Sequence, residues 1–293
     1  MTLVRENQDV RATRTQAKMV NPSRLMTYAV LIAGVTLMVY PLLWMVLGSF
    51  RSDQEIFSNS LALPKTLDFS NYAQGWVATT PSFTRYFLNS IIICLGSVIG
   101  NVLACSLTAF AFARLEFPLK RILFGLMLLT LMLPSHVLLI PQYILFVNLD
   151  WVNTYLPLIV PKFMATDAFF IFLMVQFIRK IPKELDEAAR VDGCSTFRIF
   201  ASIIFPLMQP AIITTTIFTF IWTYNDFFSQ LIYLTSPEIL TVPVGLRSLV
   251  DSSGGSYGQL LAMSVLSMVP VFVVFLFFQR RLVEGISTSG LKG

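Results

Sequence analysis

"KELDEAARVDGCSTFRIFASIIFPLMQP", residues 183–210, is a polar segment that separates two apolar stretches of the chain. A first helix is indicated by Glu184, Asp186 and Glu187, because negative charges suit the positive end of a helix dipole. Gly193 can end that helix, since glycine readily adopts the backbone conformation found just beyond helix C-termini. The segment therefore predicts a short, charged helix of about two and a half turns.

A second, amphipathic helix is expected to follow the first. Ser195 or Thr196 can cap its start, and apolar residues then recur at helical spacing. Phe205-Pro206 is expected to turn the chain back into an apolar stretch. Together the two helices predict a bent knob, residues 183–206.

One face of the first helix suits contact with another protein. Leu185, Ala188 and Ala189 share this face, and the two small alanines would let a partner's backbone approach closely. Glu187 and Arg190 would supply polar anchoring beside them. Such a projecting segment is typical of one that binds in a cleft of another protein.

The chain as a whole is too apolar for a soluble domain. Of its 293 residues 55% are hydrophobic and only 13% are charged, and its mean hydropathy is +0.71. A helix needs roughly 20 apolar residues to cross a bilayer, and six stretches qualify, which predicts an all-α integral membrane protein with six transmembrane helices. Pro134 and Pro141 are expected to bend the third. The six stretches are Leu25–Phe50, Tyr86–Phe112, Ile122–Val147, Pro157–Ile178, Leu207–Leu234 and Gln259–Gln279.

Basic residues predict the orientation, because they collect on the cytoplasmic side of bacterial-type membranes. Sixteen of the 21 Lys and Arg residues fall on one side of the six predicted spans. Both termini are therefore expected in the cytoplasm of a multi-pass protein of the bacterial inner membrane, and the net charge of +5 gives no reason to expect a nucleic-acid partner. The first apolar run is longer than a signal-peptide core and is expected to remain as an anchor. The expected organisation is a basic tail over 1–24, a transmembrane domain over 25–279 with a cytoplasmic loop at 179–206, and a C-terminal tail over 280–293.

No catalytic or metal-binding arrangement is visible in the sequence. Cys94, Cys105 and Cys194 lack metal-ligand spacing, and the first two lie in an apolar stretch, where cysteine commonly behaves as a small hydrophobe. His136 has no acidic partner nearby in sequence, which favours a packing or interface role over proton transfer. Phosphate-binding glycine loops and nucleophile elbows are not found either. We therefore expect neither an enzyme nor a cofactor bound by this chain.

The knob also carries a family signature. Glu187-Ala188-Ala189, Gly193 and Ile203-Ile204-Phe205-Pro206 resemble the "EAA…G…I-LP" pattern of binding-protein-dependent ABC importer permeases, with Phe205 where the pattern favours Leu. The stretches 133–160, 222–250 and 280–293 are similar to the carbohydrate branch, and specifically to the smaller, maltose-permease-like subunit of a heterodimeric permease. The resemblance covers residues 86–293 well and the first span more loosely.

This resemblance implies that the loop at 179–206 is a coupling element seated in a cleft of a cytoplasmic ATPase subunit. It also implies three partners besides the lipid bilayer: a sister permease, two copies of the ATPase, and an extracytoplasmic solute-binding protein. ATP and Mg²⁺ would bind the ATPase subunits. The residues that the resemblance assigns to ATPase coupling are Glu184, Leu185, Glu187, Ala188, Ala189, Arg190, Asp192 and Gly193.

Polar residues in the fifth predicted span are candidates for a substrate path. Trp222, Tyr224, Asn225 and Asp226 combine aromatic rings, an amide and a carboxylate, which suit a sugar rich in hydroxyl groups. The alternative is that Asn225 and Asp226 bond to neighbouring helices. Lys162 and Asp167, in the fourth span, could pair with the partner subunit or lie in a wet outer vestibule.

Between the fifth and sixth spans lies "DSSGGSYG", residues 251–258, which composition alone favours as a mobile linker. In the family that the chain resembles, this region faces the docked binding protein. The resemblance therefore implies that Ser252, Ser253, Gly254, Gly255 and Ser256 contact the binding protein.

Two other classes compete with an importer subunit. A self-sufficient, ion-coupled secondary sugar transporter usually shows more spans, internal repeats and broken helices, whereas six spans and no convincing repeat are found here. An integral membrane enzyme is disfavoured because no catalytic constellation is visible. The sequence does not identify the sugar, nor whether it is neutral or acidic.

Overall fold

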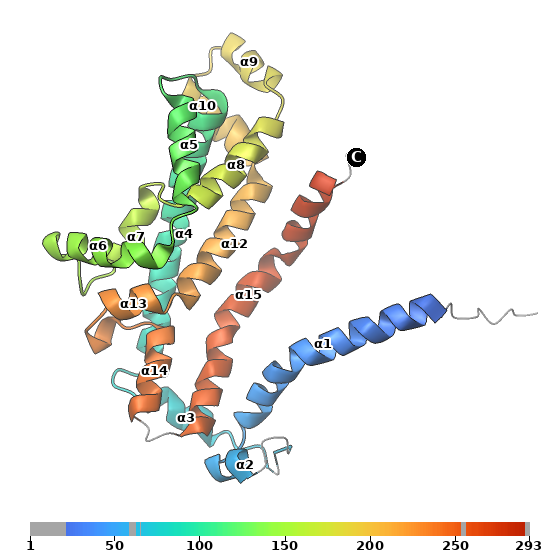
Figure 1. The fold of residues 1–293 in the computed structure, drawn as a ribbon, viewed down its shortest axis with the longest axis vertical. Coiled ribbons are helices and arrows are strands. Elements are labelled where there is room, and N and C mark those ends of the chain that lie inside the picture. Colours follow the sequence, from blue (N-terminus) through green and yellow to red (C-terminus); the bar gives the residue numbers. More distant parts are fainter. Residues whose placement is uncertain (1–21, 59–62, 65, 253–255, 291–293) are drawn as a thin grey trace, which may run out of the picture. The chain divides into compact units, whose positions relative to one another are not determined.

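The computed structural model describes residues 22–58, 63–64, 66–252 and 256–290, and this part of the chain is helical and contains no strand (Figure 1). The chain divides into two units, residues 1–45 and 46–293. The all-α class predicted from composition is confirmed. The basic tail expected at 1–24 lies almost entirely outside the described residues.

The chain combines long apolar helices with shorter ones between them. In chain order they are α1 (Pro22–Gly48), α2 (Asp53–Ser58), α3 (Ser70–Val77), α4 (Phe83–Arg114), α5 (Lys120–Thr130), α6 (Ser135–Asn148), α7 (Leu156–Phe163), α8 (Ala168–Lys180), α9 (Glu184–Val191), α10 (Thr196–Ile199), the π-helix η1 (Phe200–Ile204), α11 (Phe205–Leu207), α12 (Gln209–Asn225), α13 (Phe228–Tyr233), the 3-10 turn η2 (Pro237–Ile239), α14 (Val242–Ser252) and α15 (Tyr257–Gly290).

The first unit, in its described part, consists of most of α1. Its apolar stretch Met26–Gly48 is long enough to cross a membrane, and none of its most apolar window is buried. A helix that is apolar on all sides suits contact with lipid. This matches the first predicted span.

Helix α4 is the centre of the second unit and packs against α7, α8 and α12. Small residues on its buried face let these neighbours approach closely. At Gly100 an added Cβ would lie 2.5 Å from the ring of Phe163, so only glycine fits there. Asn101 Nδ2 donates a hydrogen bond of 2.7 Å to Thr219 Oγ1 of α12 and so ties the two helices together across the apolar interior.

Four of the described helices are long and apolar enough to cross a membrane, or five if the bent pair Thr196–Leu207 and Gln209–Asn225 is one span. The third predicted span, 122–147, forms two shorter helices, α5 and α6. Pro134 precedes the first residue of α6, and proline disfavours helical backbone at the residue before it. The count of six spans therefore remains a prediction.

The fifth predicted span also ends earlier than expected. Helix α12 stops at Asn225, and Asp226 takes up extended backbone with φ −70° and ψ 100°. Asp226 Oδ1 accepts a hydrogen bond of 3.1 Å from Ser229 N, so this carboxylate supports the start of α13 instead of continuing α12. The polar end of the span is thus a helix break.

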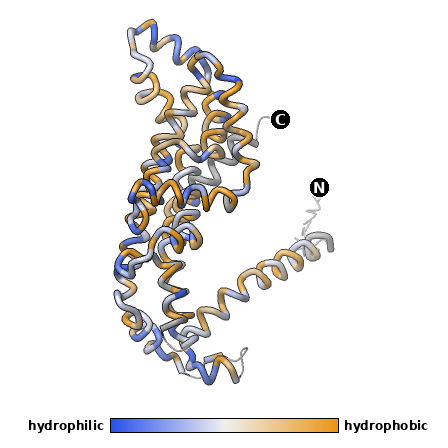
Figure 2. Tube along the Cα trace, turned by 60° about the vertical axis from the view of Figure 1, so that its left-hand side comes forward, coloured by the Kyte–Doolittle hydropathy of each residue, from blue (hydrophilic) through white to orange (hydrophobic). Residues whose placement is uncertain are grey.

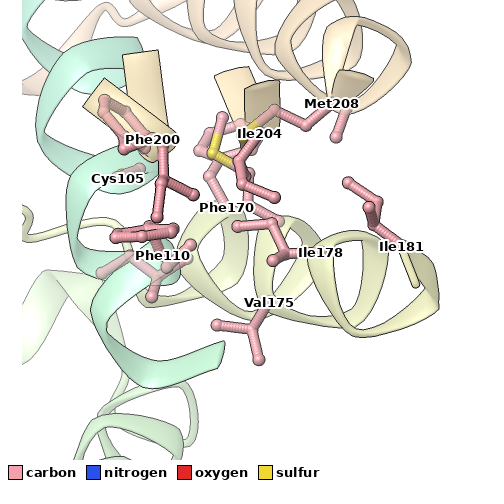
Figure 3. Packing of buried hydrophobic residues seen from close by; sticks show 14 of the residues in the cluster. Cys105, Phe110, Phe170, Val175, Ile178, Ile181, Phe200, Ile204 and Met208 are labelled. Atoms are coloured by element: carbon pink, nitrogen blue, oxygen red, sulfur yellow. The ribbon is translucent and has the colours of Figure 1, made fainter. Parts of the chain in front are cut away.

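Apolar side chains from α4, α8, η1 and α12 form a shared core, and Figure 3 shows Phe110, Phe170, Phe200 and Ile204 meeting within it. In this core Ile178 and Ile204 are fully buried. Hydrophilic residues gather instead on the loop that carries α9, whereas the long helices are mostly hydrophobic (Figure 2). The core therefore holds the polar knob against the ends of the apolar helices.

Candidate functional site

The knob begins with α9, which forms where the sequence predicts it. Two backbone hydrogen bonds close the turn at its end. Gly193 N–H donates to Arg190 O at 3.0 Å, and Cys194 N–H donates to Ala189 O at 2.9 Å. Gly193 has φ +79°, which lies in the left-handed region that favours glycine. The predicted helix end at Gly193 is confirmed.

The second helix of the knob starts at Ser195, whose hydroxyl accepts a hydrogen bond of 3.3 Å from Arg198 N. Of the two predicted caps, Ser195 is therefore the one that the chain uses. The helix continues through η1 and α11 to Leu207. There the direction changes by 76° into α12, close to the expected turn at Phe205-Pro206.

Most residues expected to touch a partner lie on the surface of the knob. Ala189 is the exception, because it is only 6% exposed and packs into the core that contains Ile199 and Phe200. The expectation that Ala189 shares an exposed face with Leu185 and Ala188 is wrong, because Ala189 packs against the second helix of the knob while the other two residues stay exposed. The exposed residues are Glu184, Leu185, Glu187, Ala188, Arg190, Asp192 and Gly193.

Two apolar side chains on the knob are exposed, although they were not predicted as contact residues. Val191 is 89% exposed at the end of α9, and Phe197 is 69% exposed on α10. Neither interrupts the apolar periodicity, so the sequence pattern alone suggests a place in the core. An aromatic and an aliphatic side chain left uncovered beside polar ones are typical of a surface that another protein covers.

A buried ion pair joins the knob to the central helix. Arg114 Nε lies 2.8 Å from Asp186 Oδ2, and the two side chains are only 3% and 8% exposed. Arg114 Nη2 also donates a hydrogen bond of 2.6 Å to Ile181 O, just before α9. From the sequence, Asp186 was expected only to offset the positive end of the helix dipole. The available signal was Arg114 itself, the last residue of a long apolar helix.

The second candidate region is a cavity of about 490 Å³ among α7, α12 and α13. Trp222, Asn225 and Asp226, three of the four predicted path residues, line it together with Lys162 and Gln230. Its walls thus combine an indole ring with amide, carboxylate and ammonium groups. Such a mixture suits a polar molecule with an apolar face.

The fourth predicted path residue lies elsewhere. Tyr224 is 2% exposed and stacks on Phe220 with ring centroids 5.8 Å apart, on the side of α12 that faces the core. Asn225 Nδ2 donates to Ile221 O at 2.9 Å within its own helix. Asn225 and Asp226 therefore bond locally rather than to neighbouring helices, and their side chains remain at the cavity wall.

Lys162 and Asp167 pair with each other. Lys162 Nζ lies 2.8 Å from Asp167 Oδ2, and both side chains are a little over one quarter exposed. The pair bridges the break between α7 and α8, where Ala165 has φ +54°. It also compensates the charge of Lys162 at the cavity wall.

The comparisons with known proteins agree with this arrangement. Residues 96–288 match the family described as "Binding-protein-dependent transport system inner membrane component". The chain belongs to this family. It is 36% identical over 258 residues to the arabinooligosaccharides transport system permease protein AraQ of Halalkalibacterium halodurans, a match that covers 87% of this chain and 91% of the relative.

A second relative of this inner-membrane component is the trehalose/maltose transport system permease protein MalG of Thermococcus litoralis. The two are 33% identical over 269 residues, which are 90% of this chain and 96% of the relative. In fold, the component resembles a chain from the crystal structure of a bacterial ABC transporter that imports the acidic polysaccharide alginate. The TM-score is 0.77 at 22% identity, over 89% of this chain and 98% of that chain. The protein is thus a multi-pass component of the inner membrane.

At the opposite end of the second unit from the knob, the inner-membrane component holds α14 against α4 (Figure 1). Val242 N–H donates to Ser90 Oγ at 2.9 Å, and Gly245 lies against the ring of Tyr86 with no room for a Cβ. Helix α14 extends through Ser252, so the expected linker is shorter than the sequence suggested. Of the residues expected to touch a binding protein, Ser253, Gly254 and Gly255 lie outside the described residues.

The remaining candidates give no further site. Cys94 and Cys105 are buried free thiols, as expected for small hydrophobes, and Cys194 is partly buried. His136 lies in α6, and its side chain is outside the described part of the structure. Over the residues that the structure describes, no group of three or more His, Cys, Asp or Glu side chains could hold a metal ion.

Proposed function

We propose that the protein is a pore-forming permease subunit of an ATP-driven, binding-protein-dependent importer for a sugar or oligosaccharide. The family membership and the names of the relatives support the class of transporter and the class of substrate. The observation that carries the proposal is the knob, a polar, exposed helix that a buried ion pair fixes to the central membrane helix. Because the chain has no nucleotide-binding motif, it needs such an element to transmit the movement of an ATPase subunit to its membrane helices.

In this proposal the knob couples the permease to a cytoplasmic ATPase. The contact residues are Glu184, Leu185, Glu187, Ala188, Arg190, Asp192 and Gly193, and Ala189 contributes from inside by packing the knob. Closure of the ATPase pair moves the knob as a rigid body. Since Arg114 joins Asp186 to α4, the motion reaches the helices that pack around α4.

The proposed assembly contains this chain, a sister permease, two ATPase copies and an extracytoplasmic binding protein. ATP and Mg²⁺ bind the ATPase copies, and no cofactor binds this chain. Both termini face the cytoplasm, with tails at 1–24 and 280–293, a membrane domain at 25–279 and the coupling loop at 179–206. The segment 252–256 then faces outward and contacts the binding protein.

The cavity lined by Trp222, Asn225 and Asp226 is the proposed wall of the substrate path. An indole ring can stack on the apolar face of a sugar, and amide and carboxylate groups can bond its hydroxyls. Tyr224 supports this wall from behind, through packing, and takes no direct part.

Reconstitution tests the proposal. The chain alone in liposomes is expected to take up no sugar above the control, with or without an ion gradient. Liposomes that also contain the sister permease and the ATPase, supplied with binding protein and ATP, are expected to accumulate sugar. Uptake by the chain alone in response to a proton or sodium gradient would identify a secondary carrier instead.

A further inference from the structure

Another cavity, of about 680 Å³, lies where α4 ends and α5 begins, against the end of α8. Its lining differs from that of the cavity beside α12, because three cations and three aromatic rings meet in it. They are Lys120, Arg121, Arg179, Phe112, Phe117 and Phe124.

The positive charge of this basic pocket is only partly compensated. Lys120 Nζ donates to Leu115 O at 2.6 Å and pairs with Glu116 at 3.1 Å, which accounts for one charge. The guanidinium groups of Arg121 and Arg179 make no hydrogen bond or ion pair with any residue in the described part of the chain. The pocket therefore has two guanidinium groups available for an anion.

An aromatic wall holds one of these groups in place. Arg179 lies over the ring of Phe124 with its guanidinium carbon 5.4 Å from the ring centroid. Phe124 in turn meets Phe112 at 5.3 Å between ring centroids, and Phe112 meets Phe117 at 5.7 Å. A guanidinium group stacked on a ring loses less freedom when it binds a ligand, and its planar fork matches the oxygens of a phosphate.

The position of the basic pocket indicates the source of the phosphate. It lies at the ends of three apolar helices, where membrane helices commonly carry aromatic and basic residues at the level of the lipid headgroups. From the pocket, an exposed apolar stripe continues along α5. It consists of Ile122, Leu126 and Leu129, which are 59%, 53% and 58% exposed. A free phosphate has no apolar part that could contact this stripe, whereas the acyl chains of a phospholipid can lie along it.

We propose that the basic pocket binds the phosphate group of an anionic phospholipid, with the acyl chains lying along the exposed face of α5. Arg121 and Arg179 donate hydrogen bonds to the phosphate oxygens, which are stronger than bonds between neutral groups. The phenylalanine rings exclude water from beneath the phosphate. Basic pockets between membrane helices are known to suit lipid headgroups. This site is separate from the knob and does not depend on which substrate is transported.

Native mass spectrometry of the full-length chain, purified in mild detergent with its partner subunits, tests the proposal. The probes are dioleoyl phosphatidylglycerol, dioleoyl phosphatidylcholine and inorganic phosphate. We expect one tightly bound phosphatidylglycerol per copy of this chain, and weaker binding of phosphatidylcholine. Arg121→Ala and Arg179→Ala are each expected to weaken the phosphatidylglycerol complex by about tenfold, the loss of one charged hydrogen bond.

The matched control is Lys180→Ala, which removes a positive charge one residue from Arg179, from a side chain that lines a different cavity. It is expected to leave phosphatidylglycerol binding unchanged. Arg121 is exposed and makes no side-chain bond in the described part of the chain, so its replacement leaves the fold intact. Retained binding in both pocket variants, or equal loss in the control, would overturn the proposal. Displacement of the lipid by millimolar inorganic phosphate would show that the pocket takes a free anion.

Discussion

Arg114 and Asp186 are 72 residues apart in sequence and form a buried ion pair with Nε and Oδ2 2.8 Å apart. The pair joins the last residue of α4 to the first turn of α9. Because α4 packs against α7, α8 and α12, the ion pair links α9 directly to the central helix of the second unit. The proposed coupling role of the knob therefore depends on this pair as much as on the surface of α9.

Asp186→Ala is expected to lower the stability of the protein and its transport rate together. Removing one partner leaves Arg114 buried and uncompensated, a change that typically costs about 3–5 kcal/mol. Thermal unfolding of the purified complex and sugar uptake in liposomes measure the two effects. Glu238→Ala, which removes an exposed acid from η2, outside the knob and the cavity, serves as the control and should change neither.

The double variant Arg114→Met with Asp186→Leu separates stability from coupling. Replacing both charges with apolar groups removes the uncompensated charge, so thermal stability should largely return. Transport should remain below wild type if the ion pair is needed to hold α9 to α4 during movement. Full recovery of transport would contradict a mechanical role for the pair.

Glu187→Lys is expected to uncouple the permease from its ATPase. Glu187 is exposed on α9 and, in the proposed assembly, faces a basic residue of the ATPase subunit. Losing a buried, hydrogen-bonded charge pair across an interface costs about 2–5 kcal/mol. Co-purification of the ATPase and substrate-stimulated ATP hydrolysis should both fall, while membrane insertion persists. Wild-type assembly and stimulation in this variant would refute the coupling role of α9.

Gly193→Val is expected to distort the turn between the two helices of the knob. The φ of +79° is strained for any residue with a Cβ, by about 1–2 kcal/mol and by more for a branched side chain. Nothing lies within 4 Å of an added Cβ, so the effect comes from the backbone and not from a clash. Gly193→Asn is the matched control, since asparagine tolerates left-handed backbone. ATPase stimulation should fall in the valine variant and be largely retained in the asparagine variant.

Local chemistry made part of this site predictable. The stop at Gly193 and the cap at Ser195 follow from residues within one turn of each other; the stop was predicted from the sequence, and Ser195 was one of the two predicted caps. The Arg114–Asp186 pair was not, because nothing in the sequence tells which residues meet after packing. The same holds for Ala189, whose burial depends on the second helix of the knob.

Some features of the membrane spans could likewise be predicted from the sequence, and others could not. Composition gives the all-α class and locates the long helices, because apolar length is a local property. Breaks are harder to locate, since the hydrogen bond that Asp226 Oδ1 accepts from Ser229 N beyond the end of α12 is not revealed by periodicity. The pairing of Lys162 with Asp167 likewise depends on the bend between α7 and α8.

Trp222→Ala and Asp226→Asn are expected to lower the maximal rate of sugar uptake. Both side chains line the cavity of about 490 Å³, and a lost bond to a charged group is worth about 1.5–3 kcal/mol, a change of about tenfold or more. Tyr224→Phe is the control, because its buried hydroxyl has no hydrogen-bond partner in the described part of the chain. Uptake by the control should stay at the wild-type rate. Equal effects of all three changes would mean that the cavity is not part of the path.

The segment after α14 provides the last prediction. Gly254→Val with Gly255→Val should enlarge and stiffen a tip that, in the proposed assembly, contacts the docked binding protein. We expect two rates to fall by several fold: ATP hydrolysis stimulated by the sugar-loaded binding protein, and sugar uptake. A fall of this size corresponds to about 1 kcal/mol of free energy in the stimulated step. Basal ATP hydrolysis should persist, because the knob and its ion pair are unchanged. Ser248→Ala, a substitution within α14 ahead of the tip, is the comparison variant. If stimulation and uptake in the double variant equal those of Ser248→Ala, the segment is a plain linker and the binding protein docks elsewhere.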